Sequence, residues 1–246
     1  MKEALGTRQK TKIEAAKRKR NQHHEQTRKE RKCYYARRDL ARADPDGVLS
    51  LILDKWDSAK TTCPFFARAP GAWWNGMKHD VLEQHVLGLM IHGVPNKHYF
   101  YTINTSIGSG ANLNIEGIRQ MLAAEYATKP LPRTIHIQSD NASDNKCWTM
   151  LLWLAMLVYH DYTGSVEMSF LIVGHTHEDI DQLFSTISRW MKGLGNVLTP
   201  QQFDRELTAA MGTRHSKAER MQVVAGGFEP PSLTSASEMP SPTEPR

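Results

Sequence analysis

Apolar and polar residues alternate in blocks that predict a mixture of strands and helices. The short apolar run over residues 48–53 follows the turn-forming cluster at 44–47 and is typical of a buried strand. Residues 85–91 and 98–104 predict two further strands, and the Gly-Val-Pro-Asn sequence at 93–96 suits an antiparallel connection between them. The first half of the globular part is therefore predicted to be a meander of three strands.

The second half of the chain alternates between helical and strand-like periodicity. In order, it predicts a helix over 115–126, a strand over 134–138, a largely buried helix over 146–160, a strand over 166–173, a helix over 176–191 and one more amphipathic helix over 199–211. The core order β-β-β-α-β-α-β-α indicates an α/β fold with a mixed five-stranded sheet flanked by helices, because the later parallel strands need crossover helices.

Charge divides the chain into parts. Between Met1 and Arg42 there are 15 Lys or Arg against 5 Asp or Glu, a net +10, so the other 204 residues carry −5 of the total of +5. Residues 1–43 are predicted to form a basic helical arm, 48–192 the core, 199–215 the extra helical segment and 226–246 a disordered Pro- and Ser-rich tail. The arm is interpreted either as a solvated helix or as a segment that binds phosphates or serves as a nuclear import signal. The second interpretation is centred on two basic clusters: Lys17, Arg18, Lys19 and Arg20, then Arg28, Lys29, Arg31 and Lys32.

Cysteine usage and hydropathy restrict the class of protein. Cys33, Cys63 and Cys147 lie far apart, which supports neither a disulfide framework nor a thiolate zinc site. The longest apolar run, 150–159, is half of the roughly 20 residues that span a bilayer. We therefore expect a soluble intracellular protein without a membrane partner.

Acidic residues follow three of the predicted strands. Asp54 comes directly after the first strand and Asp140 after the fourth, while Glu178 and Asp181 begin the helix after the fifth. Carboxylates that converge at the ends of parallel strands repel one another, and a bound Mg²⁺ or Mn²⁺ relieves that repulsion. Each acid alone also fits the role of a turn residue or helix cap.

Three segments resemble a known family. The sequences LDKWDSAK at 53–60, SDN and DNK at 139–146, and GHTHEDID at 174–181 followed by Phe184-Ser185 are similar to the transposase-like domain of unknown function in eukaryotic transposon-derived proteins. That domain is thought to be a ribonuclease H-like DDE/DDD integrase core, and the resemblance covers about 49–191.

The resemblance implies a metal-dependent transposase or nuclease that hydrolyses or transfers phosphodiesters of DNA with two Mg²⁺ or Mn²⁺ ions. Its acidic triad is carried over onto Asp54, Asp140 and Asp181, the last two 41 positions apart, with Glu178 as a further metal ligand. His175 and His177 would support the ligands, or would instead be hydrogen-bonded residues of the junction.

Two other interpretations remain open. The alternative is an inactive, domesticated copy that acts as an interaction protein or as a protein that binds DNA, or RNA, with the arm and Trp73-Trp74 as its contact surface. A zinc-dependent hydrolase is the third hypothesis, based on His175, His177 and Asp179. A nucleic-acid partner implies a nuclear protein.

Overall fold

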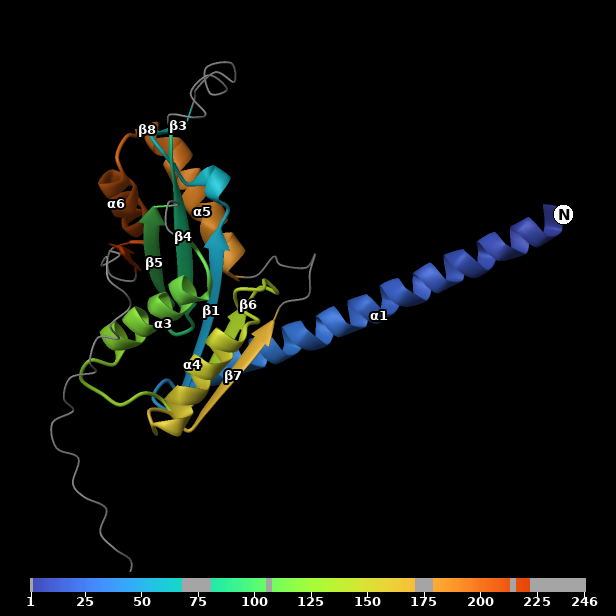
Figure 1. Cartoon of the computed structure of the whole chain (residues 1–246), viewed down its shortest axis with the longest axis horizontal. Helices are drawn as coiled ribbons and strands as arrows, with labels where there is room; N and C mark the ends of the chain where they lie inside the picture. Colours follow the sequence, from blue (N-terminus) through green and yellow to red (C-terminus); the bar gives the residue numbers. More distant parts are fainter. Residues whose placement is uncertain (1, 68–80, 105–107, 171–178, 213–215, 222–246) are drawn as a thin grey trace, which may run out of the picture.

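The computed structural model describes residues 2–67, 81–104, 108–170, 179–212 and 216–221 (Figure 1). The helices are α1 (Lys2–Ala43), the short 3-10 helix η1 (Ser58–Lys60), α3 (Ala111–Glu125), α4 (Trp148–Tyr159), α5 (Asp179–Leu194) and α6 (Pro200–Met211). The strands are β1 (Val48–Trp56), β2 (Thr62–Cys63), β3 (Phe65–Phe66), β4 (Leu82–Ile91), β5 (Lys97–Asn104), β6 (Thr134–Ser139), β7 (Ser165–Phe170), β8 (Asn196–Val197) and β9 (Ser216–Arg220).

One mixed sheet forms the centre of the domain. Its strand order is β7-β6-β1-β4-β5-β9, with β2 paired to β4 at one end. Strands β1, β4 and β5 form the predicted antiparallel meander, and β6 and β7 add in parallel on the other side of β1. The α/β class and the mixed sheet are thus confirmed, but within the described residues the sheet has seven strands rather than five.

Strand β9 is the main addition that the sequence pattern did not predict. Its sequence, Ser-Lys-Ala-Glu-Arg, carries three charged residues and lacks the apolar alternation of a half-buried strand. It pairs in parallel with β5 at the edge of the sheet, and α6 packs beside it. An edge strand needs only one paired side, so polar residues are acceptable there.

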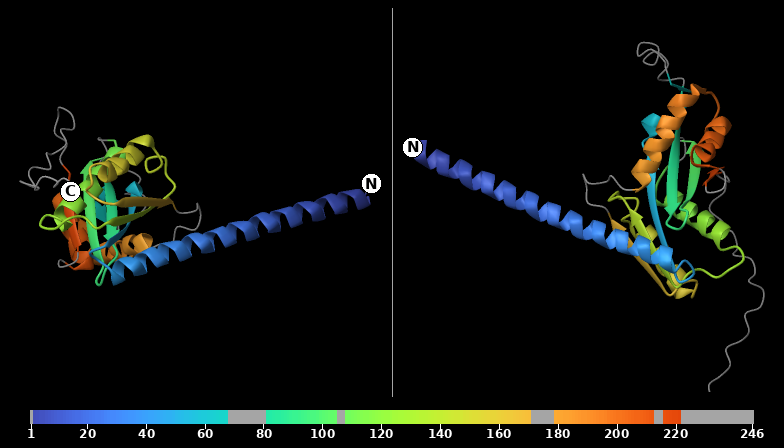
Figure 2. Two further views of the ribbon diagram at one scale, coloured as in Figure 1. Left: turned by 90° about the horizontal axis from the view of Figure 1, so that it is seen from below. Right: turned by 180° about the vertical axis from the view of Figure 1, so that it is seen from behind.

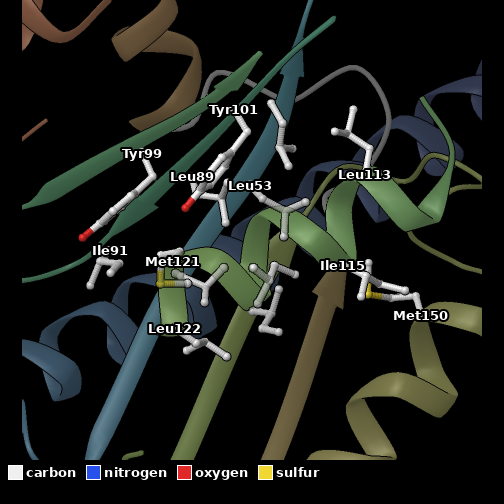
Figure 3. Packing of buried hydrophobic residues seen from close by; sticks show 14 of the residues in the cluster. Leu53, Leu89, Ile91, Tyr99, Tyr101, Leu113, Ile115, Met121, Leu122 and Met150 are labelled. Atoms are coloured by element: carbon white, nitrogen blue, oxygen red, sulfur yellow. The ribbon is translucent and has the colours of Figure 1, made fainter. Parts of the chain in front are cut away.

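Alternate residues of the strands enter two separate cores. Leu51 and Leu53 of β1 join the cluster under α3 and α4, which Figure 3 shows in detail. Ile52 and Trp56 point the other way, into the cluster under α5 and α6. Seen along the sheet, α3 and α4 lie on one face and α1, α5 and α6 on the other (Figure 2).

Helix α5 approaches the sheet closely because one strand residue has no side chain. A Cβ added at Gly88 of β4 would lie 2.7 Å from Phe184 Cζ and 3.4 Å from Ile180 Cδ1. Phe184 also stacks on Trp56, with ring centroids 5.3 Å apart. The missing side chain of Gly88 therefore makes room for the ring of Phe184, and this packing sets the distance between α5 and the sheet.

Helix α1 divides into a projecting half and a docked half. The side chains described between residues 12 and 26 are exposed or half-buried, and this part extends away from the sheet (Figures 1 and 2). Farther along, Thr27, Tyr34 and Ala41 are buried. The expectation of a solvated arm therefore holds only for the first half, because Tyr34 and Ala41 lie on the face that meets the domain, whereas Tyr35 and Leu40 are exposed.

The turn after α1 has the predicted chemistry. Pro45 cannot continue the helix, and the Gly47 amide donates a hydrogen bond to Asp44 Oδ1 at 3.0 Å. Strand β1 begins at the next residue, which places the docked half of α1 directly before the centre of the sheet.

Helix α4 is not the largely buried helix that its composition predicts. Only Met150 and Leu154 are buried, although the helix contains no charged residue. A short run of apolar residues cannot by itself distinguish a helix buried on all sides from one that is covered on one side only. The extra helix over 199–211 is present as α6, and the tail at 226–246 lies outside the described residues.

No helix among the described residues is both long enough and apolar enough to cross a bilayer.

Candidate functional site

The pairing of β1 with β6 places two of the predicted acids at one end of the sheet. The strands are parallel and Leu53 pairs with Ser139, so Asp54 and Asp140 each come one residue after that pair. Asp54 also pairs with Gly88 of β4, on the face that α5 covers. The side-chain alternation of β1 directs the Asp54 carboxylate to the face of α5, to which Ile52 and Trp56 also point, and Asp140 follows the last residue of β6.

The third acid comes from the first turn of α5. Asp181 follows Ile180, which is buried against the sheet, and it lines an open cleft of about 700 Å³ together with Asp54. Ser185, Ser188 and Lys192 continue along the same side of the helix into that cleft. Asp140 approaches Asp54 from the β6 side.

The electrostatic state of Asp54 shows that the three acids interact. Burial raises the pKa of Asp54 to about 7, and the negative charges of Asp140 and Asp181 contribute to that rise, against a hydrogen bond from the Lys55 amide at 2.8 Å. Near neutral pH this carboxyl group is therefore partly protonated. A carboxylate held in such a field has a strong tendency to bind a proton or a cation.

Two asparagines hold Asp140 in place. The Asn145 amide donates to Asp140 Oδ1 at 2.6 Å, and the Ala142 amide donates to the same oxygen at 3.2 Å. Asn114 of α3 in turn donates to Asn145 Oδ1 at 2.7 Å, and both asparagines are buried. Both hydrogen bonds orient the carboxylate through its Oδ1 atom, and within the described part of the chain no hydrogen bond engages Oδ2.

Lys55 connects β1 to the loops at the same end of the sheet. Its ammonium group lies 2.7 Å from Asp144 Oδ2 and also donates to the Ser109 carbonyl. Lys60 lies in the cleft 3.4 Å from Asp57 and is largely exposed. Lys146 places its ammonium group over the ring of Phe170.

The docked half of α1 contacts the residue that begins α5. Tyr34 Oη lies 2.8 Å from His92 Nε2 and 3.2 Å from Asp179 Oδ2, and Arg38 pairs with the same Asp179 oxygen at 3.4 Å. His92 is also 2.9 Å from Ser50 Oγ, and its burial lowers the pKa of its imidazole to about 4. Helix α1 therefore anchors the start of the helix that carries Asp181.

The remaining predicted residues of the site fall outside the described ranges. His175, His177 and Glu178 belong to the segment 171–178, which the structure does not describe, and so does the proposed start of a zinc motif. Trp73 and Trp74 likewise lie outside the described residues.

The donor set of the described acids suits a hard cation. Asp54, Asp140 and Asp181 offer only oxygen atoms, the ligands that Mg²⁺ and Mn²⁺ prefer. Within the described ranges, no three His, Cys, Asp or Glu side chains are close enough to hold a single ion. The arrangement therefore fits an ion that keeps several waters and takes one or two carboxylates, as Mg²⁺ commonly does.

The basic clusters of the arm are accessible. Lys17, Arg18, Lys19 and Arg20 are exposed, and so are Arg28, Lys29 and Lys32, whereas Arg31 is half-buried. Lys29 forms an ion pair with Glu25 at 3.0 Å, which reduces its availability to other anions.

Several residues that shape the site were missed from the sequence alone. Asn145 lies in the Asp-Asn-Lys motif, so the sequence indicated that it lies near Asp140. Nothing in the sequence indicated that its side chain donates a hydrogen bond to the Asp140 carboxylate. Tyr34, Arg38 and His92 come from a helix and a turn far from the acids along the chain, and no local pattern connects them. Their contribution became visible only from the packing of α1 on the sheet.

Comparison with known proteins assigns the chain to a family, but the description of that family names no activity. No curated protein matches the chain at a significant level. The sequence model of one family matches residues 75–229, which include Asp140 and Asp181 but neither Asp54 nor α1. That match covers more than half of the chain, and the protein therefore belongs to the DUF7869 family, a domain of unknown function.

Proposed function

We propose that this chain is a metal-dependent phosphodiesterase of the transposase or nuclease type that acts on DNA. The observation that carries the proposal is the interaction of three carboxylates from distant parts of the chain, which contributes to a pKa of about 7 at Asp54. Such clusters destabilise a fold unless they serve a ligand, and perturbed carboxyl groups in a cleft are typical of functional sites.

The sheet supports a ribonuclease H-like interpretation. An antiparallel meander of β1, β4 and β5, followed by β6 and β7 added in parallel beside β1, gives the order that the resemblance implies for an integrase core. Acids at the carboxyl ends of β1 and β6 then face a common crevice, where ligands of open α/β sheets bind. The proposed origin from a transposable element rests on the same resemblance.

Each acid has a distinct task in this proposal. The charges of Asp140 and Asp181 both act on Asp54, so Asp54 would help to hold both ions, while Asp140 and Asp181 would each help to hold one. Asn145 keeps Asp140 oriented, and Asp181 is positioned through the packing of α5 on Gly88. When bound, divalent ions supply the positive charge that stabilises in-line attack on a phosphodiester.

The cleft provides room for the substrate strand. It extends from Asp54 and Asp181 along α5 to Lys192, and Lys60 lies on its wall. The acids would hold ions at one end, while the lysines and the hydroxyl groups of Ser185 and Ser188 would contact the backbone phosphates. The exposed clusters of α1 add a long-range attraction for DNA, which fits a nuclear protein.

The first prediction tests catalysis. With Mg²⁺ or Mn²⁺ the full chain should nick supercoiled DNA, and Asp140→Asn should lower the rate on the order of 10²–10³-fold, because it removes a carboxylate that would hold an ion, and loss of one group that supplies positive charge to the transition state costs about that much. The matched control is Asp57→Asn, an acid of the same cleft that is exposed and pairs with Lys60. Gel assays of nicking with both variants measure the difference.

The outcome separates this proposal from its alternatives. Nicking that persists in Asp140→Asn, or that Asp57→Asn abolishes equally, contradicts the assignment of the site. DNA binding without any metal-dependent nicking by the unmodified chain favours a domesticated binding protein. Zinc retained after dialysis favours the hydrolase instead.

A second prediction concerns the arm. Residues 1–26 contain 8 Lys or Arg and 3 Asp or Glu, half of the +10 of the arm, and they lie before the docked residues. Deletion of 1–26 should lower the affinity for DNA and reduce the slope of log K against log salt by about 0.9 for each phosphate group that the arm no longer binds. Fluorescence anisotropy over a salt series measures both, and thermal unfolding should remain unchanged.

An unchanged salt slope after this deletion would show that the arm does not contact phosphates. A matched variant with the four residues of the cluster at 17–20 replaced by Gln keeps the length of the helix and isolates its charge.

A further inference from the structure

An aromatic side chain lines the cleft at the end opposite to the acids. Phe65 belongs to β3, which pairs with β8 so that Phe65 lies opposite Val197 and Phe66 opposite Asn196. Strand β8 directly follows the last turn of α5, so this pair of strands lies at the end of the helix farther from Asp181 (Figure 1). Phe65 packs against the core beside Val197 but is only half-buried. Part of its ring therefore faces the cleft.

Phe65 differs from the other aromatic residues of the cleft. Trp56 and Phe184 also line it, but both are buried and their rings are stacked on each other with 9° between the planes. Within the described ranges no other ring contacts Phe65. A ligand in the cleft can therefore reach the ring of Phe65, whereas Trp56 and Phe184 belong to the floor.

Polar side chains of α5 form a line between the two ends of the cleft. They are separated by four, three and four positions, and they are Asp181, Ser185, Ser188 and Lys192. At 1.5 Å per residue this line is about 16 Å long. Thr186, outside the cleft, donates a hydrogen bond to the carbonyl four residues earlier, but the hydroxyl groups of Ser185 and Ser188 have no such partner in the described part of the chain. Both hydroxyl groups are therefore available as donors to a ligand.

We propose that the cleft binds an unpaired strand of DNA, with one base stacked on Phe65 and the backbone along the polar line of α5. This inference deepens the proposed function and rests on it. Bases within a duplex are stacked on their neighbours, so a side chain reaches the face of a base only where the nucleotide is unpaired. The volume of about 700 Å³ is within the range that holds a drug-sized ligand, which corresponds to roughly one or two nucleotides rather than a duplex.

The charges of the cleft suit a short strand better than a duplex. Lys192 is exposed at the end near Phe65, whereas Lys60 on the wall lies 3.4 Å from Asp57, which partly neutralises it. A duplex is bound by neutralising many phosphates, and the exposed basic residues that could do so lie on α1. Sites for single strands instead combine a few cations with an aromatic surface for the bases. The arm would therefore attract duplex DNA, while the cleft takes the unpaired strand.

The test compares two strands that differ only in their bases. Oligo-dT of about ten nucleotides and an abasic strand of the same length carry equal numbers of phosphates, so the ratio of their affinities isolates the contribution of the bases. EDTA prevents cleavage. Fluorescence anisotropy should show that the full chain binds oligo-dT at least about 5-fold more tightly, because stacking of one base on an aromatic side chain contributes about 5-fold to 100-fold.

Substitution of Phe65 should remove this preference. Phe65→Leu keeps an apolar side chain against the core but has no aromatic face, so it should bind both strands with similar affinity. Phe66→Leu is the matched control, since Phe66 is the next residue of β3, is also half-buried and does not line the cleft. Lys192→Gln should weaken the binding of both strands by the same factor, because it acts on phosphates.

A tryptophan variant keeps the test decisive if leucine destabilises the pair of β3 and β8. Phe65→Trp retains an aromatic face, so the preference for oligo-dT should persist. Oligo-dT should also quench the emission of the added indole more than the abasic strand does, measured against the unmodified chain. Phe66→Trp should show no such difference between the strands.

Three outcomes overturn the proposal. These are equal affinities of the unmodified chain for the two strands, a preference that Phe65→Leu retains, and an indole in Phe65→Trp that responds equally to both strands. The binding measurements need no catalysis, so failure of this inference is distinguishable from failure of the proposed function. A chain that prefers oligo-dT through Phe65 but never nicks DNA supports the inference and contradicts the proposed catalysis, whereas nicking without this preference does the reverse.

Discussion

Asp54→Asn should abolish metal-dependent nicking and at the same time stabilise the fold. The folded chain holds the Asp54 proton much more tightly than the unfolded chain, because the pKa rises from 3.8 to about 7. Stability of the unmodified protein therefore falls as the pH rises from about 4 to about 7 and then levels. An Asn side chain does not ionise and avoids that loss.

The size of the effect follows from the shift. One pKa unit corresponds to about 1.4 kcal/mol, so Asp54→Asn should add about 2–4 kcal/mol to the free energy of unfolding at pH ~8, and close to nothing below pH ~4. Urea unfolding at several pH values, without divalent ions, measures this. Asp57→Asn, on an exposed acid of the same cleft, should change stability little at any pH.

Metal provides the complementary measurement. Mg²⁺ or Mn²⁺ at about 100 times its dissociation constant should stabilise the unmodified chain by about 2.7 kcal/mol and the Asp54→Asn variant far less. Equal stability of both proteins at alkaline pH would mean that burial and the charges of Asp140 and Asp181 do not raise the pKa of Asp54, and equal stabilisation by metal would mean that Asp54 does not hold the ion.

Tyr34→Ala should be the most destabilising substitution on α1. The ring is 1% exposed, and its hydroxyl contacts both His92 and Asp179. Truncation of a large buried aromatic residue costs about 3–5 kcal/mol, which should appear in urea unfolding of the full chain. It should also lower the nicking rate, because Asp179 is in the same turn of α5 as Asp181.

Two further variants divide this effect into its parts. Tyr34→Phe keeps the ring and leaves His92 and Asp179 without the hydroxyl, a loss of about 1–3 kcal/mol. Tyr35→Ala removes the neighbouring, more exposed ring and should cost under about 1 kcal/mol. If Tyr34→Ala were no more harmful than Tyr35→Ala, α1 would not be docked in solution.

Much of the fold was accessible from the sequence because local patterns and tertiary structure agree. The meander, both parallel strands and the helices between them appear within a few residues of their predicted bounds. The errors occur where long-range packing decides. The polar β9 is a strand only because β5 offers it a free edge, and α4 is half-exposed although its composition indicates a core helix.

The sequence could predict those residues of the site that lie near the ends of strands, because the apolar strands themselves could be recognised. Asp140 directly follows β6 as predicted, whereas Asp54 lies within β1, which continues to Trp56 rather than ending at residue 53, and the pairing of β1 with β6 brings the two acids to the same end of the sheet. The support around them was not predictable, since Asn114 reaches Asn145 from a different helix and Tyr34 reaches Asp179 across 145 positions of the chain.

The length of α1 has a consequence for the size of any bound DNA. A helix rises about 1.5 Å per residue, so the cluster at 17–20 lies roughly 20–25 Å along the axis from Tyr34, where the helix meets the domain. Base pairs of a duplex are stacked about 3.4 Å apart, and that reach alone equals some six or seven of them. If the proposed DNA binding holds, a duplex that contacts both the cluster at 17–20 and the surface of the domain beside Tyr34 must span more than one half-turn, and shorter oligonucleotides should gain little affinity from the arm.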